Sequence, residues 1–406
     1  MSWIEVFRVF LQLGLTSFGG PVAHIGYFRQ AFVVERAWLS EAEFASRLAL
    51  CQVLPGPASS QLGFLIGWHR AGGLGALAAW SAFTLPSALV LVLLALYGLP
   101  WASEGTFSML HGLKLVAVVI VAHAVWGMWS AMCQSTATRL LALGGFATAM
   151  WFSGWIGQFG AIALGAVIGA TLLKQNALNT SSTQATEPPE RGISHAIGRP
   201  IGRPIGTVLL AIAAGLLLIL PWLTDSQPVW QLFDAFYRAG ALVFGGGHVV
   251  LPLLQSAVVD TGMVSNDNFL VGYGLAQAVP GPLFTFAAWL GALDPASSGW
   301  SGASLALIAI FLPGLLLVAG IMPWWQYWQN NRRALCILGG INAAVVGVLA
   351  SAWVDPIVST SVRGWTDVVI VLVCTTLLML GKTGPGKTVL LAVSLAALAH
   401  WSGLSP

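Results

Sequence analysis

Two short segments of this sequence combine residues that end a helix with residues that can bind an anion. Residues 51–61 read CQVLPGPASSQ, and residues 276–286 read AQAVPGPLFTF. Proline stops a helix near the preceding residue, glycine permits a sharp turn, and a second proline suits the first turn of a new helix. The new helix begins with backbone N–H groups that have no partner within it. Such a start carries about half a positive charge and binds anions.

Two glycine-rich segments add a second kind of break, FGGP at residues 18–21 and FGGG at residues 244–247. Proline and glycine often mark only kinks in membrane helices, but two different breaks that each occur twice favour a binding site. We therefore expect half-helix starts from both halves of the chain to surround one anion. The residues predicted to bind it are Gly19, Gly20, Pro21, His24, Gln52, Pro55, Gly56, Pro57, Ser59, Gly245, Gly246, Gly247, His248, Gln277, Pro280, Gly281 and Pro282.

A cationic side chain is expected to assist, because a dianion that leaves water loses several kcal/mol of hydration per charge. Arg238 is the first candidate, since it lies on the apolar segment that leads to FGGG, four residues after Asp234. We expect Asp234 to hold Arg238 while the site is empty and to take a proton when the anion displaces it. A simple helix-stabilising salt bridge is the alternative. Further candidate ligands are Arg29, Lys114 and Asn342, which occupies the repeat position of Lys114; for Lys114 the alternative is snorkelling to the membrane interface.

The elements that position these residues are predicted to be membrane helices. Hydrophobic residues make up 57% and charged residues 8% of the 406 residues, whereas a soluble domain carries about 25% charged residues. Ser40 and Glu43 form a predicted capping box at the start of the helix that leads to the first PGP turn. Because only helices and closed barrels satisfy the backbone in lipid, and apolar runs of about 20 residues recur, we predict an all-α polytopic protein with broken half-helix hairpins and roughly 9–13 membrane segments.

The two halves of the chain resemble each other. ALCQVLPGP at residues 49–57 corresponds to GLAQAVPGP at residues 274–282, and FGGP corresponds to FGGG. The same order of glycine and proline motifs in both halves indicates an internal duplication. Basic residues occupy the early loops of the first half, whereas the matching loops of the second half carry Asp260, Asp267 and Asp294. Since basic loops stay cytoplasmic, the second repeat is predicted to be inverted, as in many transporters with a midplane site.

This organisation predicts a first repeat at residues 1–174, a polar cytoplasmic linker at 175–206, and a connecting helix with the second repeat at 207–406. The linker is rich in Ser, Thr, Pro and Gly, as expected of a solvated connector. The four cysteines lack metal-ligand spacing, so we expect no metal or cofactor. The net charge of +3 is too small to indicate nucleic-acid binding. No removable signal peptide is expected at the start.

Several of these segments together resemble a known family. FLQLGLTSFGGPVAHIGYFRQAFV, WLSEAEF and LCQVLPGP are similar to the first domain of the chromate ion transporter (CHR) family, and FGGGHVVLPLL and AQAVPGPLFTFAAWLGA to its second domain. The resemblance implies a multi-pass protein of the bacterial inner membrane that exports chromate from the cytoplasm and confers chromate resistance. The residues by themselves indicate an oxyanion transporter, coupled to protons or to the membrane potential.

Two alternatives to chromate transport stay open, and a third, an enzyme, is disfavoured by the sequence. A transporter of sulfate or another oxyanion is the runner-up, because sulfate and chromate share charge and tetrahedral shape. An anion channel could use the same half-helices to line a pore. An enzyme is not expected, since Gly-x-Ser-x-Gly, His-Glu-x-x-His and paired intramembrane aspartates are all lacking. The expected partners are the oxyanion and the lipid bilayer, and a homodimer is left open.

Overall fold

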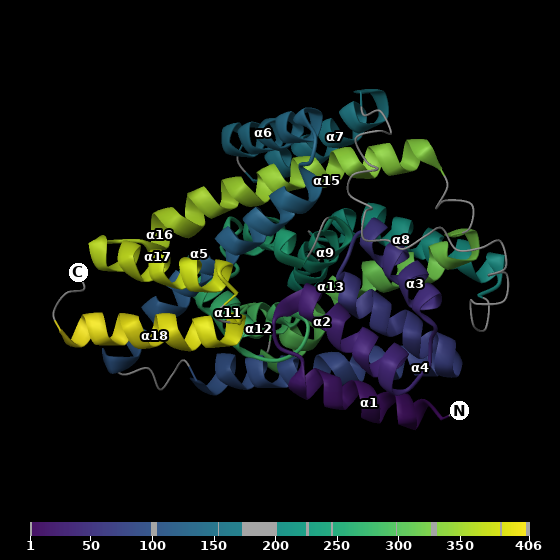
Figure 1. Ribbon diagram of the computed structural model, residues 1–406, viewed down its shortest axis with the longest axis horizontal. Coiled ribbons are helices and arrows are strands. Elements are labelled where there is room, and N and C mark those ends of the chain that lie inside the picture. Colours follow the sequence, from purple (N-terminus) through teal and green to yellow (C-terminus); the bar gives the residue numbers. More distant parts are fainter. Residues whose placement is uncertain are drawn as a thin grey trace.

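The computed structural model describes residues 2–98, 104–152, 154–172, 201–224, 227–244, 247–297, 299–325, 331–381 and 384–402. Every regular element in these ranges is a helix (Figure 1). Among the described residues, five helices are long and apolar enough to cross a membrane, and five shorter apolar helices accompany them. The chain is therefore an all-α polytopic membrane protein, as its composition predicts. Most of the predicted linker, residues 175–200, lies outside the described residues.

The described helices divide between the two halves of the chain. Those of the first half and the connecting segment are α1 (Trp3–Thr16), α2 (Gly20–Arg29), η1 (Gln30–Glu35), α3 (Glu41–Val53), α4 (Ala58–Leu93), η2 (Leu94–Gly98), α5 (Glu104–Met132), α6 (Thr136–Trp151), α7 (Gly154–Leu172) and α8 (Arg203–Leu223). Those of the second half are α9 (Pro228–Ala241), η6 (Gly247–Val249), α10 (Val250–Leu254), η7 (Gln255–Val259), α11 (Asn266–Ala278), η8 (Leu283–Thr285), α12 (Phe286–Ala292), α13 (Gly299–Ile321), η9 (Met322–Trp324), α15 (Arg332–Ala352), η10 (Trp353–Val358), α16 (Ser359–Ser361), α17 (Trp365–Met379) and α18 (Pro385–Trp401).

The element α4 consists of two legs that run in opposite directions. Ala71 and Gly72 leave the helical conformation, and Gly72 has a φ of 69°. The backbones of Gly67 and Gly75 touch, since a Cβ added to either glycine would lie 2.3 Å from the carbonyl oxygen of the other. An unbroken helix would hold these two residues about 12 Å apart. The chain therefore reverses between a short leg, residues 58–70, and a long leg, residues 73–93.

The first PGP turn joins α3 and the short leg of α4 into a hairpin. The predicted capping box starts α3: the Glu43 amide donates to the Ser40 hydroxyl at 3.2 Å, and the Ser40 amide donates to the Glu43 carboxylate at 2.8 Å. A guanidinium nitrogen of Arg47 on α3 lies 3.0 Å from His69 Nδ1 near the end of the short leg. The start of α3 and the end of the short leg of α4 therefore lie on the same side of the hairpin, and the PGP turn lies at its other end.

The two halves of the chain pack into each other rather than side by side. The helices α6 and α7 lie along α15, while α17 and α18 lie along α5 (Figure 1). Glycines permit this close approach: a Cβ added at Gly340 of α15 would lie 2.1 Å from the Gly165 carbonyl oxygen of α7. Small residues serve the same purpose in many membrane helix pairs. Each half thus supplies a helix pair to the other.

Aromatic side chains fill the space around the breaks. In the first half, Phe28 packs against Phe10 and Phe83 with ring centroids 5.6 and 5.1 Å apart. In the second half, Phe286 packs against Phe269 with a centroid distance of 5.2 Å. All of these rings are essentially buried. The breaks are therefore enclosed by apolar surroundings, in which an unpaired polar group is costly.

Candidate functional site

The PGP turns and the glycine breaks meet in the interior of the protein. The Gly56 amide donates to the carbonyl of Val243, just before FGGG, at 2.8 Å. The Gly281 amide donates to the carbonyl of Ser17, just before FGGP, at 3.0 Å. Each PGP turn thus contacts the glycine break of the other half. We call the described residues of the two turns and the two breaks, residues 17–20, 55–57, 243–244, 247 and 280–282, the crossing.

Glycine is required at both turns of the crossing. Gly56 and Gly281 have φ angles of 120° and 114°, a region that other residues rarely adopt. A Cβ at Gly56 would lie 3.1 Å from the Cα of Gly314 on α13, and one at Gly281 would lie 2.6 Å from Ser87 Oγ on α4. The long helix of each half therefore packs against the turn of the other half, and no larger residue fits without movement.

Two helix starts of the first half converge at the crossing. The N-caps of α2 and α4 are Gly19 and Pro57, and neither provides a side-chain cap. The buried His24 ring connects them: Nε2 lies 3.3 Å from the Ser17 carbonyl oxygen, and Nδ1 lies 3.5 Å from the Ser59 hydroxyl. A carbonyl only accepts, so Nε2 carries the hydrogen, and in the neutral ring the Ser59 hydroxyl donates to Nδ1.

Several buried polar groups near the crossing have no hydrogen-bond partner in the part of the chain that the structure describes. They are the hydroxyls of Ser17, Ser60 and Thr84, the side-chain oxygen of Gln61 and the side-chain nitrogen of Gln277. A buried polar group left unpaired costs about 1–3 kcal/mol, so a cluster of them indicates a place for water or a ligand. Of these five, the sequence predicted only Gln277. The other four carry no charge or motif, and their only signal is their position within a few residues of a break or of Pro86.

The second half offers a different set of groups. His248 Nδ1 lies 2.8 Å from the Tyr273 hydroxyl, a partner that sequence reasoning did not identify. Gly247 begins the short element η6, whereas the predicted Gly245 and Gly246 lie outside the described residues. Gln277 is buried before its PGP turn, but its counterpart Gln52 is exposed. The two PGP turns thus share a backbone geometry but differ in their side chains.

The predicted pair of Arg238 and Asp234 lies in a pocket beside the crossing. Arg238 Nε lies 2.7 and 2.8 Å from the two carboxylate oxygens of Asp234. The pocket measures about 330 Å³ and is also lined by Gln158 of α7, by Ser256 and by Leu242, the residue before Val243. Both charged side chains are partly exposed, 32% for Arg238 and 14% for Asp234. The guanidinium is therefore accessible from the pocket.

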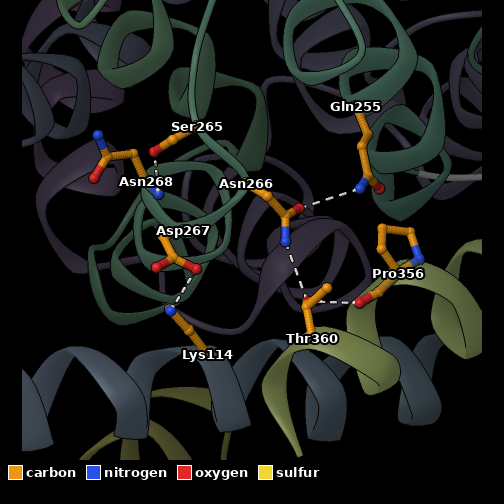
Figure 2. Close-up of polar contacts among 8 residues, drawn as sticks. All are labelled: Lys114, Gln255, Ser265, Asn266, Asp267, Asn268, Pro356 and Thr360. Atoms are coloured by element: carbon orange, nitrogen blue, oxygen red, sulfur yellow. Dashed lines mark hydrogen bonds and ion pairs between the residues drawn. The ribbon is translucent and has the colours of Figure 1, made fainter. Parts of the chain in front are cut away.

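The remaining predicted residues do not join the crossing. Arg29, in the last turn of α2, forms an ion pair with Glu41 at the start of α3, and both side chains are more than half exposed. Asn342 is half-buried on α15. Lys114 of α5 is buried and lies 2.5 Å from a carboxylate oxygen of Asp267 on α11 (Figure 2). Arg29 and Lys114 are therefore held by carboxylates at helix starts rather than directed at the turns.

A polar network surrounds the Lys114–Asp267 pair (Figure 2). Gln255 donates to Asn266 at 3.3 Å, and Asn266 donates to the Thr360 hydroxyl at 3.1 Å. Thr360 in turn donates to the carbonyl of Pro356 at 2.7 Å. The start of α11 is thus tied to α5, η7 and α16 at once. The sequence placed Asp267 in an acidic loop, whereas the structure places it at the start of α11 and pairs it with Lys114.

Comparison with known proteins agrees with this architecture. The family described as "Chromate transporter" matches residues 4–170 and 230–401. A probable chromate transport protein of Synechococcus elongatus is 29% identical over 98% of this chain and 95% of its own length. Chromate transport proteins of Cupriavidus metallidurans and Pseudomonas aeruginosa are 26% and 24% identical, over 86% and 87% of this chain and 81% of their own length. No solved structure matches the chain. With both halves matched, the chain belongs to the chromate transporter family.

Proposed function

We propose that this protein is a secondary transporter that exports chromate from the cytoplasm across the inner membrane and so confers chromate resistance. The observation that carries the proposal is the crossing, in which the Gly56 and Gly281 amides pair with carbonyls of the opposite glycine breaks. Helix starts without side-chain caps lie at that place and favour a tetrahedral anion. The relatives named chromate transport proteins supply the choice of oxyanion.

An inverted pair of repeats is part of this proposal. On the first-half side, Arg70 at the end of the short leg of α4 reaches Glu5 at 3.8 Å and the Trp38 ring at 4.7 Å. The open ends of the first-half hairpins, opposite their turns, therefore lie on the side of Arg70. The long leg of α4, about 30 Å at 1.5 Å per residue, then leads away toward α5, in which Lys114 lies about 15 Å from the helix start and pairs with Asp267. These contacts support hairpins that enter the membrane from opposite sides, the arrangement used in alternating access.

Proton coupling is proposed for the Arg238–Asp234 pair. In the empty pocket Asp234 neutralises Arg238 with both of its oxygens. An arriving oxyanion can take the guanidinium fork in its place. The released carboxylate, 14% exposed, is then stabilised by taking a proton from the pocket. When the oxyanion replaces the Asp234 carboxylate on Arg238, the oxyanion and a proton are bound together, and this links oxyanion movement to proton movement.

The test is chromate flux into proteoliposomes that hold the purified full-length protein. Imposed pH gradients and membrane potentials are varied independently, and sulfate is added as a competitor. We expect chromate flux that shifts its reversal point with the pH gradient and is weakened little by equimolar sulfate. A reversal point set by the chromate gradient and voltage alone would instead identify an anion channel. Stronger flux of sulfate than of chromate would overturn the assigned substrate.

A further inference from the structure

The two PGP turns are followed by different side chains. The first turn continues with Ser59 and Ser60, and the corresponding residues after the second turn are Phe284 and Thr285. Phe284 is buried and packs against Phe311 with ring centroids 5.7 Å apart. Thr285 uses its hydroxyl to donate to the Pro282 carbonyl at 2.7 Å. Ser60 is only 2% exposed, and its hydroxyl has no partner among the described residues.

A second unpaired hydroxyl lies on the same side of the crossing. Ser17 is fully buried and its hydroxyl lacks a partner in the described part of the chain. His24 spans the distance between Ser17 and the start of α4, because its two ring nitrogens contact the Ser17 carbonyl and the Ser59 hydroxyl. Ser17 and the start of α4, which carries Ser60, therefore lie on either side of the His24 ring, and the N-caps of α2 and α4 have no side-chain hydrogen bond.

The chemistry of this region favours an anion over a cation. A cation would need free carbonyl oxygens, but the carbonyls of Ser17 and Val243 already accept hydrogen bonds from the Gly281 and Gly56 amides. The unpaired hydroxyls and the first amides of the two helices donate hydrogen bonds, and the unpaired Gln61 side-chain oxygen is an acceptor beside them. A tetrahedral oxyanion offers four acceptor oxygens to such donors, and both helix dipoles point their positive ends toward it.

We propose that the dehydrated oxyanion binds at a single site in the first half, between the starts of α2 and α4, where the Ser17 and Ser60 hydroxyls donate to it. This inference rests on the proposed transport function and adds that the two repeats contribute unequally. The second half closes the site by its backbone, through the Gly281 amide on the Ser17 carbonyl. Thr285, the counterpart of Ser60, instead donates its hydroxyl to the carbonyl of Pro282. The Arg238 pocket is then the place where the solvated anion arrives.

The test compares Ser17→Ala, Ser60→Ala and their double variant with the matched control Thr285→Ala. Chromate uptake is measured in proteoliposomes of the full-length protein, and chromate-dependent thermal stabilisation is measured in detergent. We expect each serine variant to raise the KM for chromate about tenfold and the double variant about 100-fold, the size of one and two lost hydrogen bonds to a charged ligand. Thr285→Ala should change KM less than about twofold, because its hydroxyl already has a backbone partner.

Folding and binding can be separated in these variants. Because Ser17 and Ser60 hold unpaired hydroxyls, their removal should leave the Tm of the ligand-free protein unchanged or raised. The rise in Tm caused by chromate should be lost. A double variant that keeps the wild-type KM would overturn this site while transport itself stands. An equal rise in KM in Thr285→Ala would overturn the inequality of the repeats, and a wild-type protein that moves no oxyanion would overturn the proposed function and the site together.

Discussion

Arg238 holds two roles in this structure that single substitutions can separate, its charge and its planar fork. Its Nε already lies 2.7 Å from an Asp234 oxygen, so the guanidinium is positioned before an anion arrives. We predict that Arg238→Gln lowers initial chromate flux roughly 100-fold, as expected when a charged partner of a dianion is removed. Arg238→Lys should retain part of the flux, because the charge remains while the fork is lost.

The matched control for Arg238 is Arg29→Gln. Arg29 carries the same charge, but it pairs with Glu41 at an exposed hairpin end, where an ion pair contributes only about 0–1 kcal/mol. Its flux should stay within about twofold of wild type, because exposed pairs contribute little. Equal losses in Arg238→Gln and Arg29→Gln would mean that the overall positive charge, rather than the pocket, attracts the anion.

Asp234 is predicted to determine how transport depends on pH. If its carboxylate takes the proton when the anion displaces it, Asp234→Asn removes the group that titrates during the cycle. The variant should then show chromate flux that varies less with pH than the wild-type flux does. Flux measured in proteoliposomes at a series of symmetrical pH values tests this expectation. An unchanged pH profile would place the coupled proton on another group.

At the residue scale, the sequence predicted the contact between Asp234 and Arg238, but not the unpaired serines or the partner of Lys114. The spacing of Asp234 and Arg238 places them on one helix face, and the structure brings them into contact. Ser17 and Ser60 were not predicted, because a serine becomes notable only when the fold buries it without a partner. Lys114 was predicted as a ligand, but its carboxylate partner Asp267 comes from a distant helix. Such pairs depend on tertiary contacts that no local pattern encodes.

At the scale of elements, the turn glycines offer a sharp test of the crossing. Gly56 and Gly262 both have positive φ, 120° and 78°, but an added Cβ at Gly56 meets Gln61 and Gly314, whereas one at Gly262 meets nothing within 4 Å. We predict that Gly56→Ala lowers chromate flux by roughly tenfold or more, since backbone strain and a steric conflict act together. Gly262→Ala should share only the strain and keep most of the flux. Flux per inserted protein molecule is the measurement.

The breaks themselves were predictable, because proline and glycine act through local backbone geometry. The capping box at Ser40 and the hairpin at the first PGP turn also follow from local chemistry. The reversal of α4 at Gly72 did not stand out, since one glycine among several in an apolar segment carries no special signal. Which turn contacts which break was equally hidden, because the hydrogen bonds from Gly56 and Gly281 join the two halves of the chain.

At the scale of the whole molecule, the orientation of the repeats is open to direct measurement. We predict that a cysteine replacing Arg36 reacts with a membrane-impermeant reagent from the cytoplasmic side only, and one replacing Asp260 from the opposite side only. The reason is that basic loops stay cytoplasmic while Asp260 lies in the acidic region after η7. The four native cysteines are buried, so background labelling should be low. Labelling of both positions from one side would contradict inverted repeats.

The packing of α7 on α15 gives a second prediction at this scale. Gly340→Val would place its Cβ 2.1 Å from the Gly165 carbonyl oxygen, and overpacking of this kind destabilises by about 1–3 kcal/mol. We expect a lower Tm in detergent and less folded protein in the membrane. Gly127→Val on α5 is the control, because no atom lies within 4 Å of the added Cβ. A similar drop in Tm for both variants would show that valine in a helix, not the contact with α7, is responsible.

The exchange of helix pairs between the halves has a consequence for synthesis on the ribosome. When α7 emerges, its partner α15 is still more than 150 residues from being made, a delay of roughly ten seconds or more at usual elongation rates. During that interval the glycine-lined faces of α6 and α7 rest in lipid without their protein neighbour. A nascent chain in this state is exposed to membrane proteases and insertion chaperones. Each half produced alone should accordingly be degraded, and simultaneous production of both fragments should restore their survival.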